Sequence, residues 1–411
     1  MNSAKEEFKN PFRPGAGHMP PYLAGRDSEI NEFKRLLTQE AILENMVLTG
    51  LRGVGKTVLL DTFKPIAISG GWMWVGTNFS ESACLNEENV AIRLLTDLSV
   101  FTSSVVVGKQ PLNKDGFKQI PGFIGKIKEA PVLLNFGTLQ QIYSTTPGLV
   151  EDKIKKVLEI VWDCLSPSEH LRGLIFAYDE AQNLSDHAVK EQYPLSILLD
   201  VFQSIQKRGI PFMLVLTGLP TLFPKLVEAR TYTERMFRVV FLNRLKEQDI
   251  KDAIQKPIQD ENCPIIFDEK SVETIISISG GYPYFIQFIC REVYDIFIQK
   301  YSSESGRLPS VPVDEIIRKL DTDFFAGRYA RATDRQRDLL RVIAQLPNSD
   351  SEFTVQEIVE QSKKEEKPFS NSHVSQMLTT LSDAGLVYRN RYGKYAFAVP
   401  LLGQFIKRQV P

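Results

Sequence analysis

The sequence has few cysteines and no long apolar run. Its four cysteines, Cys84, Cys164, Cys263 and Cys290, show none of the close spacing that zinc sites or disulfide scaffolds use. We expect reduced, mostly buried thiols in a cytoplasmic protein. No apolar run reaches the ~18 residues that a transmembrane helix needs. Residues 1–21 are polar and rich in proline and glycine, so we do not expect a signal peptide there.

The chain also has almost no net charge. Its 49 Lys and Arg residues balance 50 Asp and Glu residues, which gives a formal charge of −1 at pH 7. This balance excludes a globally basic nucleic-acid coat and leaves room for a local basic patch. At about 150 residues per domain, 411 residues predict two or three domains.

A phosphate-binding loop is the clearest motif that the sequence does contain. The stretch from Val47 to Leu60 is typical of an apolar strand, a loop and an apolar helix, and the loop fits G-x-x-x-x-G-K-[ST] from Gly50 to Thr57. Glycines let successive backbone N–H groups point at one anion, which the N-terminus of the following helix also faces. A purely structural glycine turn is the alternative, and the apolar flanks argue against it. The predicted phosphate-binding residues are Gly50, Leu51, Arg52, Gly53, Val54, Gly55, Lys56, Thr57 and Val58.

Two of these residues have further predicted roles with ATP and magnesium. Lys56 adds a positive charge for the β- and γ-phosphates. The Thr57 hydroxyl, one residue later, is suited to ligate the Mg²⁺ that bridges those phosphates.

Two acids follow a second apolar run. Residues 173–178 are mostly apolar and lead into Asp179 and Glu180. At the carboxyl end of a parallel strand, Asp179 would stand beside the Mg²⁺ and Glu180 would polarise the water that attacks the γ-phosphate. Alone, this pattern favours a strand end with a solvated helix cap. The upstream phosphate loop favours the catalytic interpretation.

A third apolar run and a group of arginines complete the candidate site. Residues 211–220 predict a buried strand that contains Thr217, which could sense the γ-phosphate or hold the attacking water; a strand-end turn is the alternative. Further on, arginines at 235 and 238 precede another short strand. One of them could reach a neighbouring subunit's nucleotide, where a guanidinium stabilises the transferred phosphoryl group.

The order of these motifs resembles the AAA+ ATPases. The resemblance is to the initiator-like branch, related to archaeal and eukaryotic origin-recognition proteins and to bacterial relatives known only as ATPases. It implies that Gly25 and Arg26 line the adenine, that Asp179 and Glu180 form Walker B and that Thr217 is the first sensor. It also implies that Arg235 is the arginine finger, with Arg238 in reserve, and that Pro283 belongs to a nucleotide-contacting lid turn.

The lid departs from the family pattern. Family lids place a sensor-two arginine near the start of the later lid helix, where this chain has residues 284–287, Tyr-Phe-Ile-Gln. Its Gly-Gly-x-Pro turn at 280–283 also resembles signalling ATPases that switch conformation and often lack an arginine finger. The finger and switch interpretations therefore both stay open.

The C-terminal residues predict three helices and a hairpin. Residues 333–346, 354–361 and 370–384 have helical patterns, and residues 386–399 alternate around a turn near Gly393. This order resembles a winged helix, whose third helix enters the DNA major groove. The third helix here has no Lys or Arg, so the charge would come from Arg389, Arg391 and Lys394 on the wing. DNA contact and protein docking are both consistent with this domain.

Together these patterns predict an α/β fold: a P-loop AAA+ parallel-sheet core with a helical lid and a C-terminal winged helix. The expected parts are an N-terminal arm (1–23), the core (24–245, with an insertion at about 105–148), the lid (246–325) and the winged helix (326–411). The predicted function is Mg²⁺-dependent ATP hydrolysis coupled to homo-oligomer assembly and duplex DNA. The alternative is a nucleotide-controlled switch or scaffold that recruits a protein partner, such as the ATPase component of a bacterial defence system.

Overall fold

The computed structural model describes residues 9–103, 106–107, 132–168, 170–301, 310–391 and 393–409. The chain divides into two compact units. The first, here called the sheet unit, comprises Asp27–Thr49 and Leu59–Phe241. The second, here called the C-terminal unit, comprises Met1–Arg26, Gly50–Val58 and Leu242–Pro411. Each unit is described by itself.

A five-stranded sheet forms the centre of the sheet unit. Its strand order is β2-β5-β6-β1-β7, and the β2–β5, β5–β6 and β6–β1 pairs are parallel. The strands are β1 (Asn45–Gly50), β2 (Trp72–Val75), β5 (Gly173–Tyr178), β6 (Phe212–Gly218) and β7 (Phe237–Leu242). Every residue of β1, β5 and β6 is buried, which explains their near-continuous apolar sequences. The predicted parallel α/β core is confirmed.

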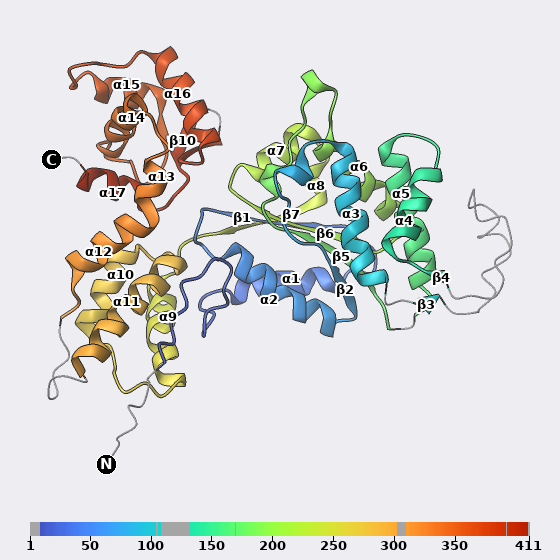
Figure 1. Cartoon of the computed structure of the whole chain (residues 1–411), viewed down its shortest axis with the longest axis horizontal. Helices are drawn as coiled ribbons and strands as arrows, with labels where there is room; N and C mark the ends of the chain where they lie inside the picture. Colours follow the sequence, from blue (N-terminus) through green and yellow to red (C-terminus); the bar gives the residue numbers. More distant parts are fainter. Residues whose placement is uncertain are drawn as a thin grey trace. The chain divides into compact units, whose positions relative to one another are not determined.

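Helices cover both faces of this sheet, with α1 and α2 on one side and α3 and α6 on the other (Figure 1). Phe33 of α1 and Phe63 of α2 stack with ring centroids 4.1 Å apart. On the opposite face, Leu174, Phe176 and Tyr178 of β5 join the buried core of the other helices. The helices are α1 (Asp27–Leu37), α2 (Lys56–Ser69), α3 (Glu87–Thr102), α4 (Phe136–Thr145), α5 (Val150–Leu165), α6 (Pro194–Lys207), α7 (Leu222–Ala229) and α8 (Thr233–Met236).

The predicted insertion lies only partly within the described residues. Its ends contain a short antiparallel pair, β3 (Val106–Val107) with β4 (Val132–Leu133), and residues 108–131 lie outside the description. The sequence did not predict α4, which begins at Phe136 and is capped by the Asn135 side chain. Leu139 and Ile142 of α4 are buried in the core shared with α3 and α5.

The C-terminal unit contains the helices expected for a lid and the elements expected for a winged helix. The first group is α9 (Glu247–Asp260), α10 (Glu269–Ser279), α11 (Pro283–Tyr301) and α12 (Val313–Leu320). A π-helical segment (Asp321–Ala326) and α13 (Gly327–Tyr329) follow. The second group is α14 (Asp334–Ala344), β8 (Phe353–Thr354), α15 (Val355–Ser362), α16 (Asn371–Asp383), β9 (Val387–Arg391), β10 (Lys394–Phe397) and α17 (Leu402–Arg408).

These C-terminal elements agree with the sequence patterns. The three predicted helices are α14, α15 and α16, and the predicted hairpin is β9–β10, which turns at Gly393 with φ +69°. The hairpin gains a third strand, because β8 pairs with β10. The helices and hairpin predicted from the sequence are thus confirmed as elements.

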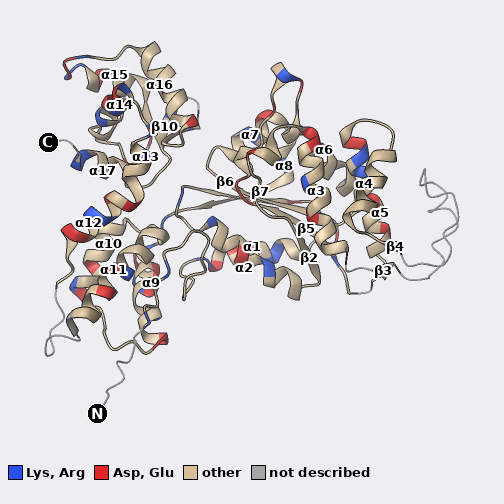
Figure 2. Cartoon of the chain, viewed as in Figure 1, with Lys and Arg blue, Asp and Glu red and all other residues tan. Residues whose placement is uncertain are grey.

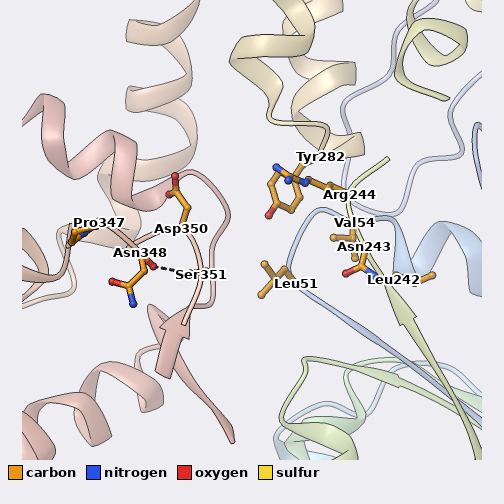
Figure 3. Close-up of a pocket in the computed structure, with 10 residues that line it drawn as sticks. All are labelled: Leu51, Val54, Leu242, Asn243, Arg244, Tyr282, Pro347, Asn348, Asp350 and Ser351. Carbon is orange, nitrogen blue, oxygen red and sulfur yellow. Dashed lines mark hydrogen bonds between the residues drawn. The ribbon is translucent and has the colours of Figure 1, made fainter. Parts of the chain in front are cut away.

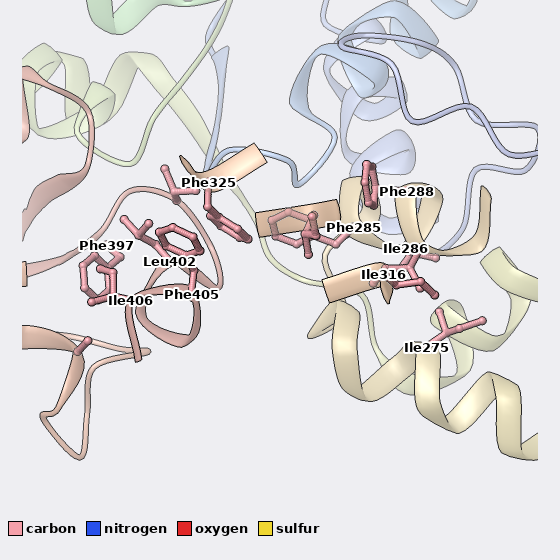
Figure 4. Close-up of a cluster of buried hydrophobic side chains, with 14 of the residues drawn as sticks. Ile275, Phe285, Ile286, Phe288, Ile316, Phe325, Phe397, Leu402, Phe405 and Ile406 are labelled. Atoms are coloured by element: carbon pink, nitrogen blue, oxygen red, sulfur yellow. The ribbon is translucent and has the colours of Figure 1, made fainter. Parts of the chain in front are cut away.

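One hydrophobic core runs through the C-terminal unit (Figure 4). Phe285 of α11 lies 5.8 Å from Phe325, and Phe325 stacks on Phe405 of α17 at 5.2 Å between ring centroids. The N-terminal arm adds to this core. Phe12 is 3% exposed and stacks on Phe267, while the Asn10 side chain donates to Asp295. The arm therefore packs against α11 and the residues just before α10 of its own chain, which the sequence did not predict.

Candidate functional site

The predicted phosphate loop has the expected strand-loop-helix form. It begins where β1 ends at Gly50, and α2 begins at Lys56. Gly53 and Gly55 have φ values of +79° and +91°, in the left-handed region that favours glycine. At Gly50 the reason is space, because a Cβ there would lie 2.6 Å from the carbonyl oxygen of Leu242.

The Lys56 side chain lies along this loop. Its Nζ donates to the carbonyl oxygens of Gly50 and Leu51, at 2.9 and 3.0 Å, and the residue is only 9% exposed. The ammonium group is therefore held at the loop by the backbone.

Arg26 supports the phosphate loop from the N-terminal side. Its guanidinium donates to the carbonyl oxygens of Val54 (2.9 Å) and Asn243 (3.0 Å), and the residue is 5% exposed. Neighbouring Gly25 has φ +62°, and a Cβ there would lie 2.6 Å from the Asp249 carboxyl group. Contact of Gly25 and Arg26 with adenine stays a prediction, whereas support of the loop by Arg26 is a feature that the sequence did not indicate.

The start of α11 also contacts the loop. Pro283 is the first residue of α11, and the backbone N–H of Tyr284 donates to the carbonyl oxygen of Gly53 at 3.1 Å. The Tyr284 ring lies against Phe324, with centroids 5.0 Å apart. Tyr284 is thus an aromatic residue that contacts the phosphate loop through its backbone.

A cavity of about 370 Å³ is lined in part by residues of this loop (Figure 3). Lys56 and Thr57 are not among its lining residues, so this cavity is not the phosphate cradle. Its lining residues are Leu51, Val54, Leu242, Asn243, Arg244, Tyr282, Pro347, Asn348, Asp350 and Ser351.

In the sheet unit, the second candidate motif lies at the carboxyl end of β5. Asp179 follows the strand directly and is 4% exposed. Its Oδ1 accepts a hydrogen bond from the hydroxyl of fully buried Thr217, near the end of β6, and another from the backbone N–H of Glu180 at 2.8 Å. Asp179 and Thr217, which were predicted separately as site residues, are therefore in direct contact.

Glu180 differs from Asp179 in environment. Its side chain is exposed, and its backbone has φ +53°, which non-glycine residues rarely adopt. Such strain is concentrated at functional sites. The carboxylate accepts a hydrogen bond from the side-chain amide of Gln182, a residue that the sequence analysis did not single out.

Asp61 on α2 is a third carboxyl group, which the sequence did not indicate. Partial burial raises the pKa of Asp61, the negative charge of Asp179 raises it further, and Lys64 opposes the shift. An aspartate inside a helix has no sequence signal of its own, so only the structure relates Asp61 to Asp179.

The two candidate arginines have different surroundings. Arg238 on β7 forms an ion pair with Glu32 at 2.7 Å within the same unit. The exposed Arg235 is on α8, and within the described ranges no hydrogen bond or ion pair of its guanidinium is found. Just before this helix, Asp200 accepts hydrogen bonds from Arg230 (2.6 Å) and from the Tyr232 hydroxyl (2.7 Å). Arg238 is therefore paired within its own unit, whereas the Arg235 side chain is exposed to solvent.

The residues predicted to hold Mg²⁺ suit that ion. Asp179 offers a buried carboxylate, which is the ligand type that Mg²⁺ prefers, and Thr57 offers a hydroxyl in the first turn of α2.

Within the described ranges, no helix has both the length and the apolar character needed to cross a bilayer.

Comparisons with known proteins identify the fold. The walker-type ATPase PABY2304 of Pyrococcus abyssi is 15% identical, with a TM-score of 0.56 over 94% of this chain and 96% of that one. The ORC2 protein of Aeropyrum pernix is 13% identical in its ADPNP-ADP complexes, with a TM-score of 0.53 over 96% of each chain. The chain therefore shares the α/β fold of these two proteins. A family model described as a domain of unknown function (DUF8462) matches residues 322–406, and no curated protein matches the sequence.

Proposed function

We propose that this chain binds ATP at the phosphate loop and hydrolyses it. The observation that carries the proposal is the strand order β5-β6-β1. Parallel neighbours present their carboxyl ends at one edge of a sheet, which is where such folds bind ligands. Asp179 and Glu180 follow β5, Thr217 lies near the end of β6, and the phosphate loop follows β1.

Each residue has a role in the proposed reaction. The backbone of residues 51–58 and Lys56 bind the phosphates, and the Glu180 carboxylate takes the proton of the attacking water. Thr217 keeps the Asp179 carboxylate in place through its hydroxyl. Thr57 and Asp179 would hold Mg²⁺, which supplies positive charge for the phosphate oxygens when bound. The lid turn around Pro283 and the Gly25–Arg26 segment would contact the base.

The proposal extends to assembly, with Arg235 acting on the nucleotide of a neighbouring subunit. An exposed arginine can reach a neighbouring subunit. Arginine fingers increase turnover by roughly 10³-fold or more. Removal of the finger in Arg235→Ala should therefore abolish most turnover while ATP binding remains. The ATPase rate of Arg235→Ala measures this, and Arg208→Ala, an exposed arginine paired with Glu159, is the matched control.

A mixing experiment separates a finger in trans from a structural role. Arg235→Ala retains Glu180, and Glu180→Gln retains Arg235, so mixed assemblies contain some complete sites. With random mixing at a heterologous interface, about a quarter of the sites should be active. Recovery of turnover on mixing supports the proposal, and two variants that stay inactive together contradict it.

Duplex DNA is the partner that we propose for the C-terminal elements, residues 326–411, as a winged helix. The third helix, α16, carries no Lys or Arg and is almost uncharged along its ribbon (Figure 2). Binding would therefore depend on the wing, where Arg389 is exposed and Lys394 begins β10. The side chain of Arg391, the third predicted residue, lies outside the described ones.

Loss of the two described wing charges should weaken DNA binding independently of sequence. For Arg389→Ala with Lys394→Ala, we expect about tenfold weaker binding and a salt dependence reduced by about two counterions. Fluorescence anisotropy of a labelled duplex over a salt series measures both quantities. Lys207→Ala with Arg208→Ala, an exposed pair at the end of α6, is the control. Equal affinities for the two double variants would contradict DNA contact through the wing.

A switch that recruits a protein partner is the second candidate function. It is favoured by the aromatic residue at the sensor-two position and by the continuous contacts from Gly53 to Tyr284 and on to Phe324. Such contacts could relay the nucleotide state through the C-terminal unit. Slow turnover that is indifferent to DNA, with ATP-dependent binding of a protein, would distinguish this function from the first.

A further inference from the structure

Gln182 connects the Glu180 carboxylate to the neighbouring strand. It lies in the short 3-10 turn Ala181–Asn183 that follows Asp179 and Glu180. Its Nε2 donates to Oε2 of Glu180, and its Oε1 accepts from the backbone N–H of Leu219 at 3.1 Å. Leu219 is the first residue after β6.

The two partners define the orientation of this amide. A backbone N–H can only donate, and an ionised carboxylate can only accept. The amide oxygen must therefore face Leu219 and the amide nitrogen must face Glu180. A flipped amide would lose both hydrogen bonds, so Gln182 is held in one orientation by its surroundings.

Gly218 provides the space for the amide. A Cβ at Gly218 would lie 2.6 Å from Oε1 of Gln182 and 2.9 Å from a side-chain carbon of Leu222. The backbone of Gly218 does not have positive φ, so space is the reason for glycine here. On the other side, Lys225 Nζ donates to the carbonyl oxygen of Gln182 at 2.8 Å and holds the turn.

The same two strand ends are joined twice. Thr217 of β6 donates to the carboxylate of Asp179, and Gln182 links the carboxylate of Glu180 to Leu219. Each of the two acids predicted to act on ATP thus has its own connection to the end of β6.

We propose that Gln182 is the residue that positions Glu180 for attack of water on ATP. This inference rests on the proposed ATP hydrolysis. Glutamate has three side-chain torsions, and an exposed one samples many orientations unless a partner restrains it. A positively charged partner would stabilise the ionised carboxylate and make it a weaker base. A neutral amide orients the carboxylate without this effect.

Gln182→Met tests the proposal, because methionine has a similar length and neither donates nor accepts strongly. We expect kcat to fall about tenfold, as for loss of a hydrogen bond to a charged group, while KM for ATP changes less than about twofold. A purely structural role would not separate kcat from KM. Gln248→Met is the matched control, since the exposed Gln248 also donates to a carboxylate, that of Asp252.

A second variant leaves Gln182 itself intact. Gly218→Ala should displace the amide and give the same fall in kcat at an unchanged KM. Thermal unfolding of each variant shows whether it is folded. If folded Gln182→Met turns over at the wild-type rate, or faster, the proposal is overturned while ATP hydrolysis stands. If the wild type itself does not hydrolyse ATP, the proposed function and this inference fall together.

Discussion

Lys56→Ala should abolish ATP binding at micromolar nucleotide. The Lys56 ammonium is buried at the loop and held by the carbonyl oxygens of Gly50 and Leu51, so it is already in place for anionic phosphates. Loss of a preorganised buried charge from a phosphate site costs about 3 kcal/mol or more, which corresponds to at least ~100-fold in affinity. Equilibrium binding of a fluorescent ATP analogue measures the change.

The control for this variant is Lys64→Ala. Lys64 is an exposed lysine on the same helix, two turns further along. The Lys64→Ala variant should bind the ATP analogue with the affinity of the wild type. Equal affinity of Lys56→Ala and the wild type for the analogue would contradict the claim that this loop binds the phosphates of ATP.

Glu180→Gln should separate binding from turnover. The substitution keeps the shape of the side chain but removes the carboxylate that accepts the proton of water, so hydrolysis should fall by roughly 10²-fold or more. Binding should remain, because the phosphates are held by the loop and not by this exposed side chain. Phosphate release and analogue binding are measured on the same preparation.

Two results would contradict the role of Glu180. If Glu180→Gln hydrolyses ATP at the wild-type rate, another group is the base. If it loses binding together with turnover, Glu180 contributes to the phosphate site itself. Glu191→Gln, another exposed glutamate with positive φ, is the matched control and should retain both properties.

The parts of the site that sequence predicts are those carried by local patterns. The phosphate loop follows from glycine, lysine and threonine at fixed spacing, and the structure confirms its strand and helix. Asp179 and Thr217 were predicted from the ends of apolar runs, and their contact follows once β5 and β6 are neighbours. Both strands are buried throughout, which makes their sequence signal strong.

The parts that sequence misses depend on contacts between distant segments. Gln182 has no local signal, because its partner Leu219 is known only from the strand order. Arg26 donates a hydrogen bond to the backbone carbonyl of Asn243, which is more than two hundred residues away in the sequence. Phe12 belongs to a proline-rich arm that predicts no element, yet it is buried against Phe267. Such contacts depend on tertiary packing, which outweighs local preference.

The measurement that tests the central claim most directly is the rate of ATP hydrolysis per subunit as the concentration of the wild-type chain rises, with Mg²⁺ present. The account predicts turnover that climbs with concentration, because a neighbouring subunit's Arg235 completes each site. It also predicts a further rise when duplex DNA is added. No turnover above that of Glu180→Gln at any concentration would contradict the claim that this chain is an ATPase.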